Sequence, residues 1–385
     1  MSFTEWMTVN TKAWKCFERL TAAQKPDVLR RLDFVRRFCI TGLMAIRPFP
    51  AVNKDIILWT ARGIFIRGRK GWKEEMKKWD VFVFGDINVD ILVPNVNRLP
   101  PAGEEWEVPV METTPGGGAA LFALGLARLG MHPVFLGRVG EDLYGGYLKN
   151  YMEEAGVDIS LLETRANART GSTISFTDDR DRSFLTFRGD CKVPDIREIS
   201  MEKVSQAGHI HLTGYAESVN HEAYLTFLQK LRRETDVTVS FDTGWDSTEK
   251  WSQRIYELFP YLDVLLMNET ESLHYSRKET AREAAEDFAS KGCMAVIKMG
   301  KKGSLCCRDG QVWSRKGFSV NAVDTTGAGD SFNAGFVYGF LKGEDPETAL
   351  CLGNGCGALS CTGLGGNTMF PTLEKLREFV EVNKE

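Results

Sequence analysis

The sequence has few histidines, no cysteine pairs at metal-binding spacing and no long apolar run. Its five histidines form no cluster, and none of the nine cysteines belongs to a Cys-x-x-Cys pair, so a zinc site is not indicated. No apolar run reaches the ~20 residues that cross a bilayer. The first residues lack the basic-then-apolar order of a secretory signal. We therefore expect reduced cysteines, a cytoplasmic location and no membrane partner.

Two common nucleotide-binding patterns are also missing. No Gly-x-x-x-x-Gly-Lys-Ser/Thr occurs, which argues against a P-loop kinase. No Gly-x-Gly-x-x-Gly follows the first expected strand, which argues against a nicotinamide-dependent dehydrogenase. The 385 residues, 43% apolar and 26% charged, are otherwise ordinary for a globular protein. One large α/β domain with accessory pieces would account for this length.

The net charge of −4 conceals an asymmetry between the two parts of the chain. Residues 1–75 carry 15 Lys+Arg against 7 Asp+Glu, and the remainder is correspondingly acidic. An acidic body argues against a nucleic-acid partner for the main domain. Apolar residues recur at helical spacing from Trp14 to Leu20 and from Val28 to Cys39. We assign residues 1–76 to a basic, partly helical extension. Its role stays open between an accessory helical pair, a nucleic-acid or membrane contact, and translation from an upstream start codon.

Short, wholly apolar runs recur after residue 77, which is typical of strands buried on both faces of a parallel sheet. They fall at 81–84, 134–136, 209–212, 237–241, 264–267 and 295–297, and alternate with helical stretches such as 119–129, 222–233 and 280–291. This alternation predicts a three-layer α/β/α domain over residues 77–385, with a mainly parallel central sheet. Ligands of such sheets bind beyond the carboxyl ends of the strands.

Two polar segments, about 97–115 and 168–189, break the alternation. Polar and apolar residues alternate over 173–177 and 184–188, and the charged run 178–182 between them indicates a hairpin tip. We expect a small β-sheet that projects from the body. It would act either as a lid that excludes water from a site or as a solvated hairpin.

The strongest chemical signal is the run 324–330, Asp-Thr-Thr-Gly-Ala-Gly-Asp, which leads into an apolar helix. Glycines permit close backbone approach, and the amides at a helix start bind anions. In one interpretation Asp330 is simply a helix cap. In the other it is a base that takes a proton from an attacking hydroxyl, while the amides of Gly327, Ala328 and Gly329 hold phosphoryl charge.

This run resembles the second signature of the ribokinase-like carbohydrate kinases, also called the phosphofructokinase-B family. Residues 115–120 are similar to the first signature of that family, 85–90 to its first strand and turn, and 268–271 to its Asn-x-x-Glu motif. The resemblance extends from about Lys77 to the C-terminus. It implies a ribokinase-like fold with a β-sheet lid, and transfer of the γ-phosphoryl group of ATP to a sugar hydroxyl.

The resemblance also implies roles for individual residues. Asp330 would be the base, and the amides of 327–329 would form the anion hole. The sugar would contact Asn88, Asp90, Gly116, Gly117 and, from the lid, Arg188. ATP would contact Asn268, Lys298, Gly300, Gly303 and Asn354. Glu271 would hold Mg²⁺ through water, and Asp324 with Thr326 would hold a monovalent cation such as K⁺. A homodimer paired through the lid is implied as well.

Two departures from the family pattern bear on the substrate. Leu121 stands where ribokinase-like members often carry Asn, which weighs against ribose. Residues 241–244 resemble the Phe-Asp-Pro-Asn of fructokinase-like and ketodeoxygluconate kinase-like members, with Gly244 in place of Asn. A fructose-like or keto-sugar, or a sugar acid, is therefore favoured. A nucleoside kinase of the same fold and a catalytically silent sugar-sensing binder are the alternatives, and Arg188 would contact the substrate or form a surface ion pair.

Overall fold

The computed structural model of the protein describes residues 44–45, 56–60, 63–67, 77–96, 98–177 and 182–383. The chain divides into two compact units, Met1–Met76 and Lys77–Glu385. In the first unit the described residues form an antiparallel sheet of β1 (Met44–Ala45), β2 (Ile56–Thr60) and β3 (Gly63–Arg67). The two helices expected between residues 14 and 39 lie outside the described residues.

The second unit is built on an eight-stranded sheet in the order β17-β16-β15-β14-β13-β12-β4-β7. Its strands are β4 (Trp79–Phe84), β7 (Pro133–Leu136), β12 (Ala207–Thr213), β13 (Thr238–Asp242), β14 (Val264–Asn268), β15 (Met294–Lys298), β16 (Ser304–Arg308) and β17 (Gln311–Arg315). Six of them, from β15 to β7, run parallel, and the β16–β17 hairpin joins β15 in antiparallel orientation. The six parallel strands contain the six apolar runs except for Val237, which precedes β13, so the predicted mainly parallel sheet is confirmed.

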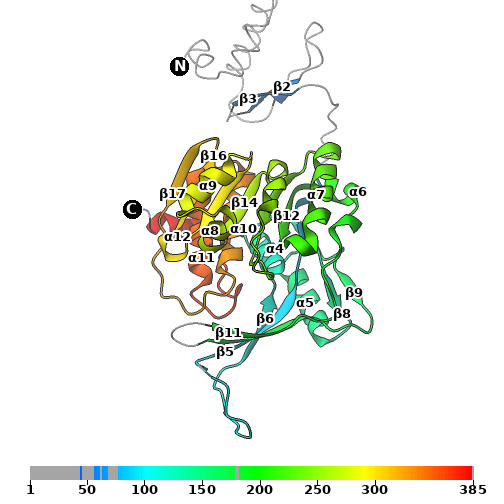
Figure 1. The fold of residues 1–385 in the computed structure, drawn as a ribbon, viewed down its shortest axis with the longest axis vertical. Coiled ribbons are helices and arrows are strands. Elements are labelled where there is room, and N and C mark those ends of the chain that lie inside the picture. Colours follow the sequence, from blue (N-terminus) through cyan, green and yellow to red (C-terminus); the bar gives the residue numbers. More distant parts are fainter. Residues whose placement is uncertain are drawn as a thin grey trace, which may run out of the picture. The chain divides into compact units, whose positions relative to one another are not determined.

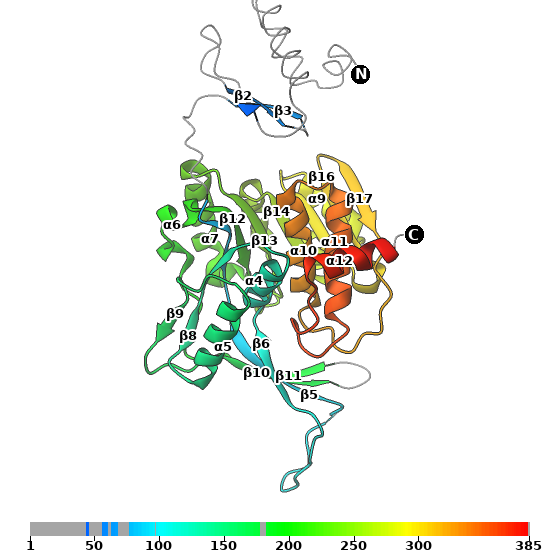
Figure 2. The same cartoon turned by 180° about the vertical axis from the view of Figure 1, so that it is seen from behind.

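Helices cover both faces of this sheet. Successive residues of each strand point to opposite sides, so a wholly apolar strand has an apolar face on each side of the sheet that must be covered. Val81 and Val83 of β4 pack into one core cluster, and Phe82 and Phe84 pack into the other. Figures 1 and 2 show the two helical layers from opposite sides. The helices are α4 (Gly118–Arg128), α5 (Leu143–Glu154), α6 (Met201–Ser205), α7 (Glu217–Glu234), α8 (Glu269–Ser276), α9 (Ala281–Ala289), α10 (Ala328–Lys342), α11 (Pro346–Ser360) and α12 (Leu373–Val382).

The short 3₁₀ helices and the smallest sheet complete the second unit. The 3₁₀ helices are η1 (Ile196–Glu198), η2 (Gln253–Glu257), η3 (Phe259–Tyr261) and η4 (Gly300–Lys302), and a parallel pair is formed by β8 (Arg138–Gly140) and β9 (Glu163–Arg165). Within the described ranges, none of the helices combines the length and apolar character that crossing a bilayer requires.

Two buried histidines of β12 are part of the core. His209 Nε2 and His211 Nδ1 each lie 2.7 Å from Ser240 Oγ, and the His211 ring stacks on Phe122. Burial lowers the pKa of both imidazoles to about 3, so both are neutral at physiological pH. Their strand spacing in the sequence thus reflects packing.

The lid is a four-stranded sheet that projects from the body at the bottom of Figures 1 and 2. Its order is β11-β10-β5-β6, with β5 (Asn88–Pro94), β6 (Glu112–Gly116), β10 (Ser172–Thr177) and β11 (Arg182–Phe187). The sequence placed lid segments at about 97–115 and 168–189. The structure adds β5 to the lid and shows no strand in the described residues from 98 to 111. β5 was not expected because its first three residues belong to the segment 85–90, which was interpreted as the first strand and its turn.

Candidate active site

The carboxyl ends of three neighbouring strands meet at one edge of the large sheet. β13 ends at Asp242, β14 at Asn268 and β15 at Lys298, and the three strands pair in parallel in that order. Lys298 Nζ lies 3.1 Å from Asn333 Oδ1 of α10, so that helix begins close to the same edge. Polar side chains therefore gather where sheets of this kind bind their ligands.

The glycine-rich run forms the start of α10. Gly327 is the N-cap with φ 68°, a left-handed conformation that a side chain would strain. Among the three amides predicted to form the anion hole, that of Ala328 donates to the Thr325 carbonyl at 3.3 Å. The amides of Gly327 and Gly329 have no acceptor within the described residues, as is usual at a helix start. Two of the three predicted amides are therefore available to an anion.

Asp330 lies in the first turn of α10, next to the start of α4. A Cβ built on Gly118 would lie 3.1 Å from Asp330 Oδ1, so glycine keeps this approach open. Burial raises the pKa of Asp330 to about 7; neighbouring carboxylates add to the rise, and the ammonium of Lys298 opposes it. A carboxyl group that titrates near neutral pH suits general-base catalysis.

The predicted sugar-binding residues come together at the base of the lid. Asn88 Nδ2 donates to Asp90 Oδ1 over 2.6 Å. Burial raises the pKa of Asp90 to about 6, although the bond from Asn88 opposes that rise. A Cβ on Gly116 would lie 2.3 Å from Asp90 Oδ1. Gly117, with φ 94°, would bring its Cβ within 2.8 Å of the Asp86 carbonyl oxygen. Both glycines are thus required by close packing.

Asp86 also belongs to this turn, although no role was predicted for it. Its carboxylate accepts the N–H groups of Gly118 and Ala119, each at 3.2 Å. It thereby caps α4, whose N-cap residue Gly117 makes no side-chain bond. Asp86 lies two residues after the end of β4, but the helix that it caps begins 32 residues later. No local spacing rule connects the two positions.

The Asn-x-x-Glu motif forms a capping box at the start of α8. Asn268 Oδ1 accepts the Glu271 N–H at 2.8 Å, while the Glu271 carboxylate accepts the Asn268 N–H at 2.9 Å and its Nδ2 at 2.7 Å. Burial raises the pKa of Glu271 to about 7, and the charge of Asp242 adds to the rise. The carboxylate keeps lone pairs for a metal-bound water. Oxygen donors of this type suit Mg²⁺.

Lys298, predicted to contact ATP, is held in the floor of the site. Its Nζ donates to Asp242 Oδ2 at 2.6 Å and to Asn333 Oδ1 at 3.1 Å. Asn333 Nδ2 donates to the same Asp242 oxygen, and Asp242 Oδ1 accepts the Gly244 N–H at 2.8 Å. The sequence predicted no role for Asp242 or Asn333, because Asp242 ends β13 and Asn333 lies in α10, 91 residues later.

The remaining predicted nucleotide residues shape the turn after β15. Gly300 has φ 56° and Gly303 has φ 100°, and a Cβ on Gly303 would lie only 2.0 Å from the Arg315 carbonyl oxygen. Asn354 of α11 donates from Nδ2 to the carbonyl oxygens of Arg315 and Lys316, at 3.3 and 3.1 Å. Asn354 therefore fixes the segment that follows β17, and its contact with adenine stays a prediction.

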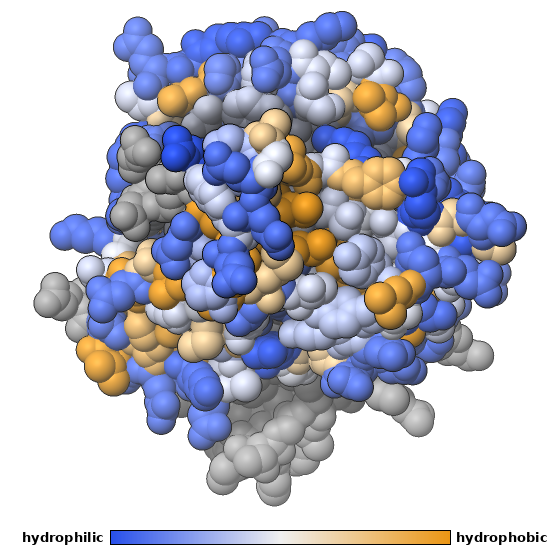
Figure 3. Space-filling model, turned by 90° about the horizontal axis from the view of Figure 1, so that it is seen from below, coloured by the Kyte–Doolittle hydropathy of each residue, from blue (hydrophilic) through white to orange (hydrophobic). Residues whose placement is uncertain are grey.

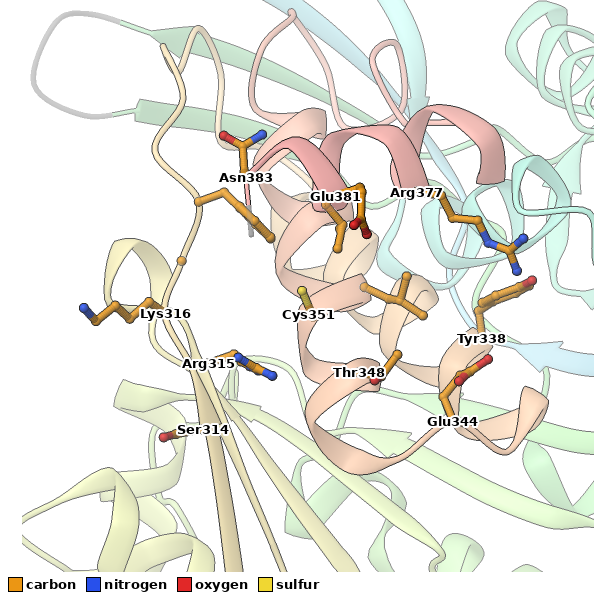
Figure 4. Close-up of a pocket in the computed structure, with 14 residues that line it drawn as sticks. Ser314, Arg315, Lys316, Tyr338, Glu344, Thr348, Cys351, Arg377, Glu381 and Asn383 are labelled. Atoms are coloured by element: carbon orange, nitrogen blue, oxygen red, sulfur yellow. The ribbon is translucent and has the colours of Figure 1, made fainter. Parts of the chain in front are cut away.

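A cleft of about 1060 Å³ opens next to that segment, between residues 314–318 and α10 to α12. Figure 4 shows Lys316 on the strand side and Thr348, Arg377 and Glu381 on the helical side. None of the residues that the sequence assigned to substrate, ATP or metal lines this cleft. It is therefore separate from the catalytic candidates.

Asp324 stabilises the loop that leads into α10. Its Oδ1 accepts the N–H and the hydroxyl of Thr326 at 2.9 and 2.7 Å, and its Oδ2 accepts the Gly365 N–H at 3.0 Å. The carboxylate is buried. These contacts hold Asp324 and Thr326 together, and a monovalent cation between them stays a prediction.

Arg188 is exposed directly after β11, and the ion pair at this point is made instead by Arg169 and Asp190, at 2.8 Å. A substrate contact of Arg188 stays a prediction.

Leu121 packs under the anion hole, since a Cβ on Gly327 would lie 2.9 Å from Leu121 Cδ1. The leucine therefore supports the glycine-rich turn.

The chain is similar in sequence to known carbohydrate kinases. The pattern of the pfkB family of carbohydrate kinases matches residues 78–373. The chain is 30% identical over 298 residues to the ATP-dependent ribose-1-phosphate kinase of Halopiger xanaduensis, covering 77% of this chain and 96% of that protein. It is 26% identical over 334 residues to the 5-dehydro-2-deoxygluconokinase of Clostridium perfringens, covering 81% and 96%.

Solved structures with the same fold include two ribokinases. The Thermotoga maritima enzyme superposes with a TM-score of 0.65 at 27% identity, over 79% of this chain and 99% of that one. The Arabidopsis thaliana enzyme, solved with ribose and ATP, gives 0.66 at 25% identity, over 79% and 99%. These matches agree with the predicted three-layer architecture and lid.

Proposed function

The chain belongs to the pfkB family of carbohydrate kinases, and from this premise we propose that it phosphorylates a small keto-sugar, fructose-like sugar or sugar acid with Asp330 as the base. A kinase of this family is an ATP-dependent phosphotransferase that acts on a hydroxyl group. The proposal concerns the residues that perform the transfer and the class of sugar that receives the phosphate.

The observation that carries the proposal is the position of Asp330. It lies in the N-terminal turn of α10, where two backbone amides are available, and beside the glycine turn 116–118, because a Cβ built on Gly118 would lie 3.1 Å from Asp330 Oδ1. The same glycine turn packs against Asp90 through Gly116. A carboxyl group between an anion nest and a carboxylate-lined turn is placed to take a proton from a hydroxyl beside a phosphate.

The transfer then needs little covalent chemistry from the protein. Asn88 and Asp90 would hold sugar hydroxyls, with Gly116 and Gly117 supplying backbone contacts. As the hydroxyl oxygen bonds to the γ-phosphorus and the bond to the ADP oxygen breaks, Asp330 receives the hydroxyl proton. The amides of Gly327 and Gly329, aided by the helix dipole, would stabilise the phosphoryl charge.

Metal binding is proposed on the chemistry of the donors. Bound with ATP, Mg²⁺ would offset the phosphate charge, and Glu271 would hold it through water. The Glu271 carboxylate fits this role because it is fixed by Asn268 and keeps free lone pairs. Asp324 and Thr326 are proposed to hold K⁺. The reduced thiols of the buried Cys293, Cys306, Cys307 and Cys356 support the proposed cytoplasmic location.

The sugar class is proposed from the relatives together with two residues. Several sequence relatives are 5-dehydro-2-deoxygluconokinases, which act on a keto sugar acid, and another is a ribose-1-phosphate kinase. Leu121 packs against Gly327 of the anion hole. It stands where ribokinase-like members often carry Asn, so this position offers no side-chain amide, which weighs against ribose. The exposed Arg188 at the end of β11 is proposed to contact an acidic or keto group of the substrate.

The test combines a substrate panel with one isosteric change. Release of ADP is measured with fructose, ribose, 5-dehydro-2-deoxygluconate, phosphorylated ketoses and nucleosides, and we expect turnover of a keto-sugar or sugar acid. Asp330→Asn should bind sugar and ATP but lose turnover by at least about 10³-fold, because the amide cannot accept the proton. Near-normal turnover of that variant would disprove the base assignment, and turnover of nucleosides alone would reassign the substrate.

A homodimer through the lid is proposed from the surface of β11. This edge strand exposes Phe184, Leu185 and Phe187, with 42–53% of each residue accessible, and Figure 3 shows apolar patches among polar side chains on the side of the lid. Edge strands with apolar side chains tend to pair. Light scattering should give the mass of a dimer for the native chain and of a monomer for Leu185→Lys. A monomeric native chain would contradict the proposal.

A further inference from the structure

The polar cluster of Asp242, Lys298 and Asn333 forms a closed ring of hydrogen bonds. The ammonium of Lys298 donates to both partners, at 2.6 and 3.1 Å, and the Asn333 amide donates back to the Asp242 oxygen that Lys298 contacts. The third ammonium proton has no acceptor in the described part of the chain. Three elements, β13, β15 and α10, thereby fix one charged group at a defined point.

The ring is buried, which makes its composition informative. The Lys298 and Asp242 side chains are only 13% and 10% exposed, and Asn333 is fully buried. Burial alone would raise the pKa of Asp242, but the charge of Lys298 and the hydrogen bonds from Lys298, Asn333 and Gly244 outweigh it and lower that pKa. Apolar residues would fill such a space at least as stably as an ion pair. A buried ion pair beside the candidate base therefore points to a role beyond stability.

The ring lies against the catalytic turn. A Cβ on Gly329 would be 3.4 Å from Lys298 Nζ, and Asn333 follows Asp330 by three residues on α10, so both side chains share one face of the helix. Asp330 is faced by Asp242 from β13, Lys298 from β15, Glu271 from α8 and Asp86 from the turn after β4. Lys298 is the single cation in this set.

We propose that Asp242 and Asn333 are positioning residues of the phosphoryl transfer: they hold the Lys298 ammonium beside Asp330, with its remaining N–H directed to the transferred phosphoryl group. This inference rests on the proposed function, since it takes Asp330 as the base and Lys298 as an ATP contact. The ammonium keeps the base ionised among carboxylates, and it neutralises charge that develops on the phosphoryl oxygens.

The test measures kcat against pH for three variants. One removes a cation near Asp330, one removes an anion, and one leaves the charge unchanged. Lys298→Met removes the cation. The acid limb of the pH profile, where Asp330 becomes protonated, should therefore move to higher pH, and kcat should fall on the order of 10²-fold. Asp242→Asn removes an anion, so the limb should move to lower pH. Asn333→Leu changes no charge, so kcat should fall while the limb stays in place. A merely structural role would not produce shifts of opposite sign.

Two further variants keep the experiment interpretable. Lys302→Met is the matched control, because Lys302 is an exposed lysine of the same turn that pairs with Glu269 at 2.9 Å; its profile should match that of the native enzyme. If Lys298→Met does not fold, the double variant Asp242→Asn/Lys298→Met leaves no unpaired buried charge. Its limb should return towards the native position, while kcat stays low because the ammonium is missing.

The two hypotheses fail in different ways. If Asp330→Asn abolishes turnover but the limbs of Lys298→Met and Asp242→Asn stay together or move in the same direction, the positioning role is wrong and the proposed base stands. If Asp330→Asn keeps turnover, the proposed function itself is wrong. Opposite shifts with a low kcat in both variants support the ring as a positioning device.

Discussion

Three carboxyl groups of the site, those of Asp90, Glu271 and Asp330, are partly or fully buried although their proposed roles require the ionised form. Burial raises the pKa of Asp90 to about 6 and those of Glu271 and Asp330 to about 7. An acid whose pKa is higher in the folded than in the unfolded protein destabilises the fold wherever it is ionised. These residues therefore exchange stability for chemistry, as functional residues often do.

Asp330→Asn should accordingly stabilise the protein while it removes activity. The pKa of Asp330 moves from its usual 3.8 to about 7, so the cost of its charge is complete above pH 7. That cost decreases as the pH falls towards 4 and is absent below. We expect a gain on the order of 2 kcal/mol at pH 8, shrinking towards zero at pH 4. Thermal unfolding at several pH values measures it.

Asp142→Asn is the control for this pH dependence, because its sign is opposite. Burial raises the pKa of Asp142, but hydrogen bonds from Thr170 and Gly145 outweigh it and lower that pKa below the usual value. The native carboxylate thus stabilises the fold at neutral pH, and the variant should be less stable there. The difference should vanish in acid. An Asp330→Asn variant that is equally destabilised at pH 8 would contradict the interpretation.

At the scale of elements, the turn between β6 and α4 connects the lid to the catalytic helix. Gly116 ends β6 and leaves room for the Asp90 carboxyl group of β5. The next two residues pack against the loop after β4 and against Asp330. Asp86 fastens the same turn by capping α4. A few close contacts therefore set the distance between the sugar-binding lid and the base.

Gly116→Ala should disturb this arrangement without unfolding the protein. The new methyl group would lie 2.3 Å from the Asp90 carboxyl carbon, so Asp90 must move. Because a displacement of about 1 Å can cost 10²-fold in rate, we expect kcat/KM for the sugar to fall by about that factor. Steady-state kinetics with varied sugar and with varied ATP separate the effect, since KM for ATP should change little.

The comparison variant is Gly146→Ala in α5. A Cβ at this position meets no atom within 4 Å, so the change should leave the kinetics unaltered. Alanine should also stabilise the helix by up to about 1 kcal/mol. If both alanine variants show native kinetics, the close packing of Gly116 on Asp90 does not control substrate binding.

At the scale of the whole molecule, the chain consists of two units of unequal size. Met1–Met76 and Lys77–Glu385 separate by their contacts, and the family match begins at residue 78. Every residue proposed for catalysis or binding lies in the second unit. We therefore propose that residues 77–385 are the kinase domain and that residues 1–76 are an extension of it.

A chain that begins at Met76 should fold and keep the native kcat and KM. The physical basis of this expectation is that, among the residues whose burial the structure describes, both core clusters of the kinase domain are formed by residues from Trp79 onward. Circular dichroism and the ADP-release assay test this with the full chain as reference. Aggregation of the truncated chain, or loss of its activity, would mean that the first unit contributes to the fold or the site.

The sequence alone determined the parts of this protein that depend on local pattern. Runs of apolar residues predicted the six parallel strands, since strands buried on both faces have no alternation. The Gly-Ala-Gly-Asp run predicted a helix that begins with available amides, and the resemblance supplied the order of the motifs. The hairpin of residues 173–188 followed from alternation. β5 and the β2–β3 hairpin were not predicted, because their side chains show no clear period.

Tertiary structure alone decided which of these motifs meet. The cap that Asp86 provides to α4, the approach of Gly118 to Asp330 and the ring of Asp242, Lys298 and Asn333 all join residues that are at least 32 positions apart. Hydrogen bonds and charges act over a few ångströms in space, whatever the distance along the chain. The sequence therefore identified Asp330 as the candidate base, whereas folding selected the neighbours that set its pKa.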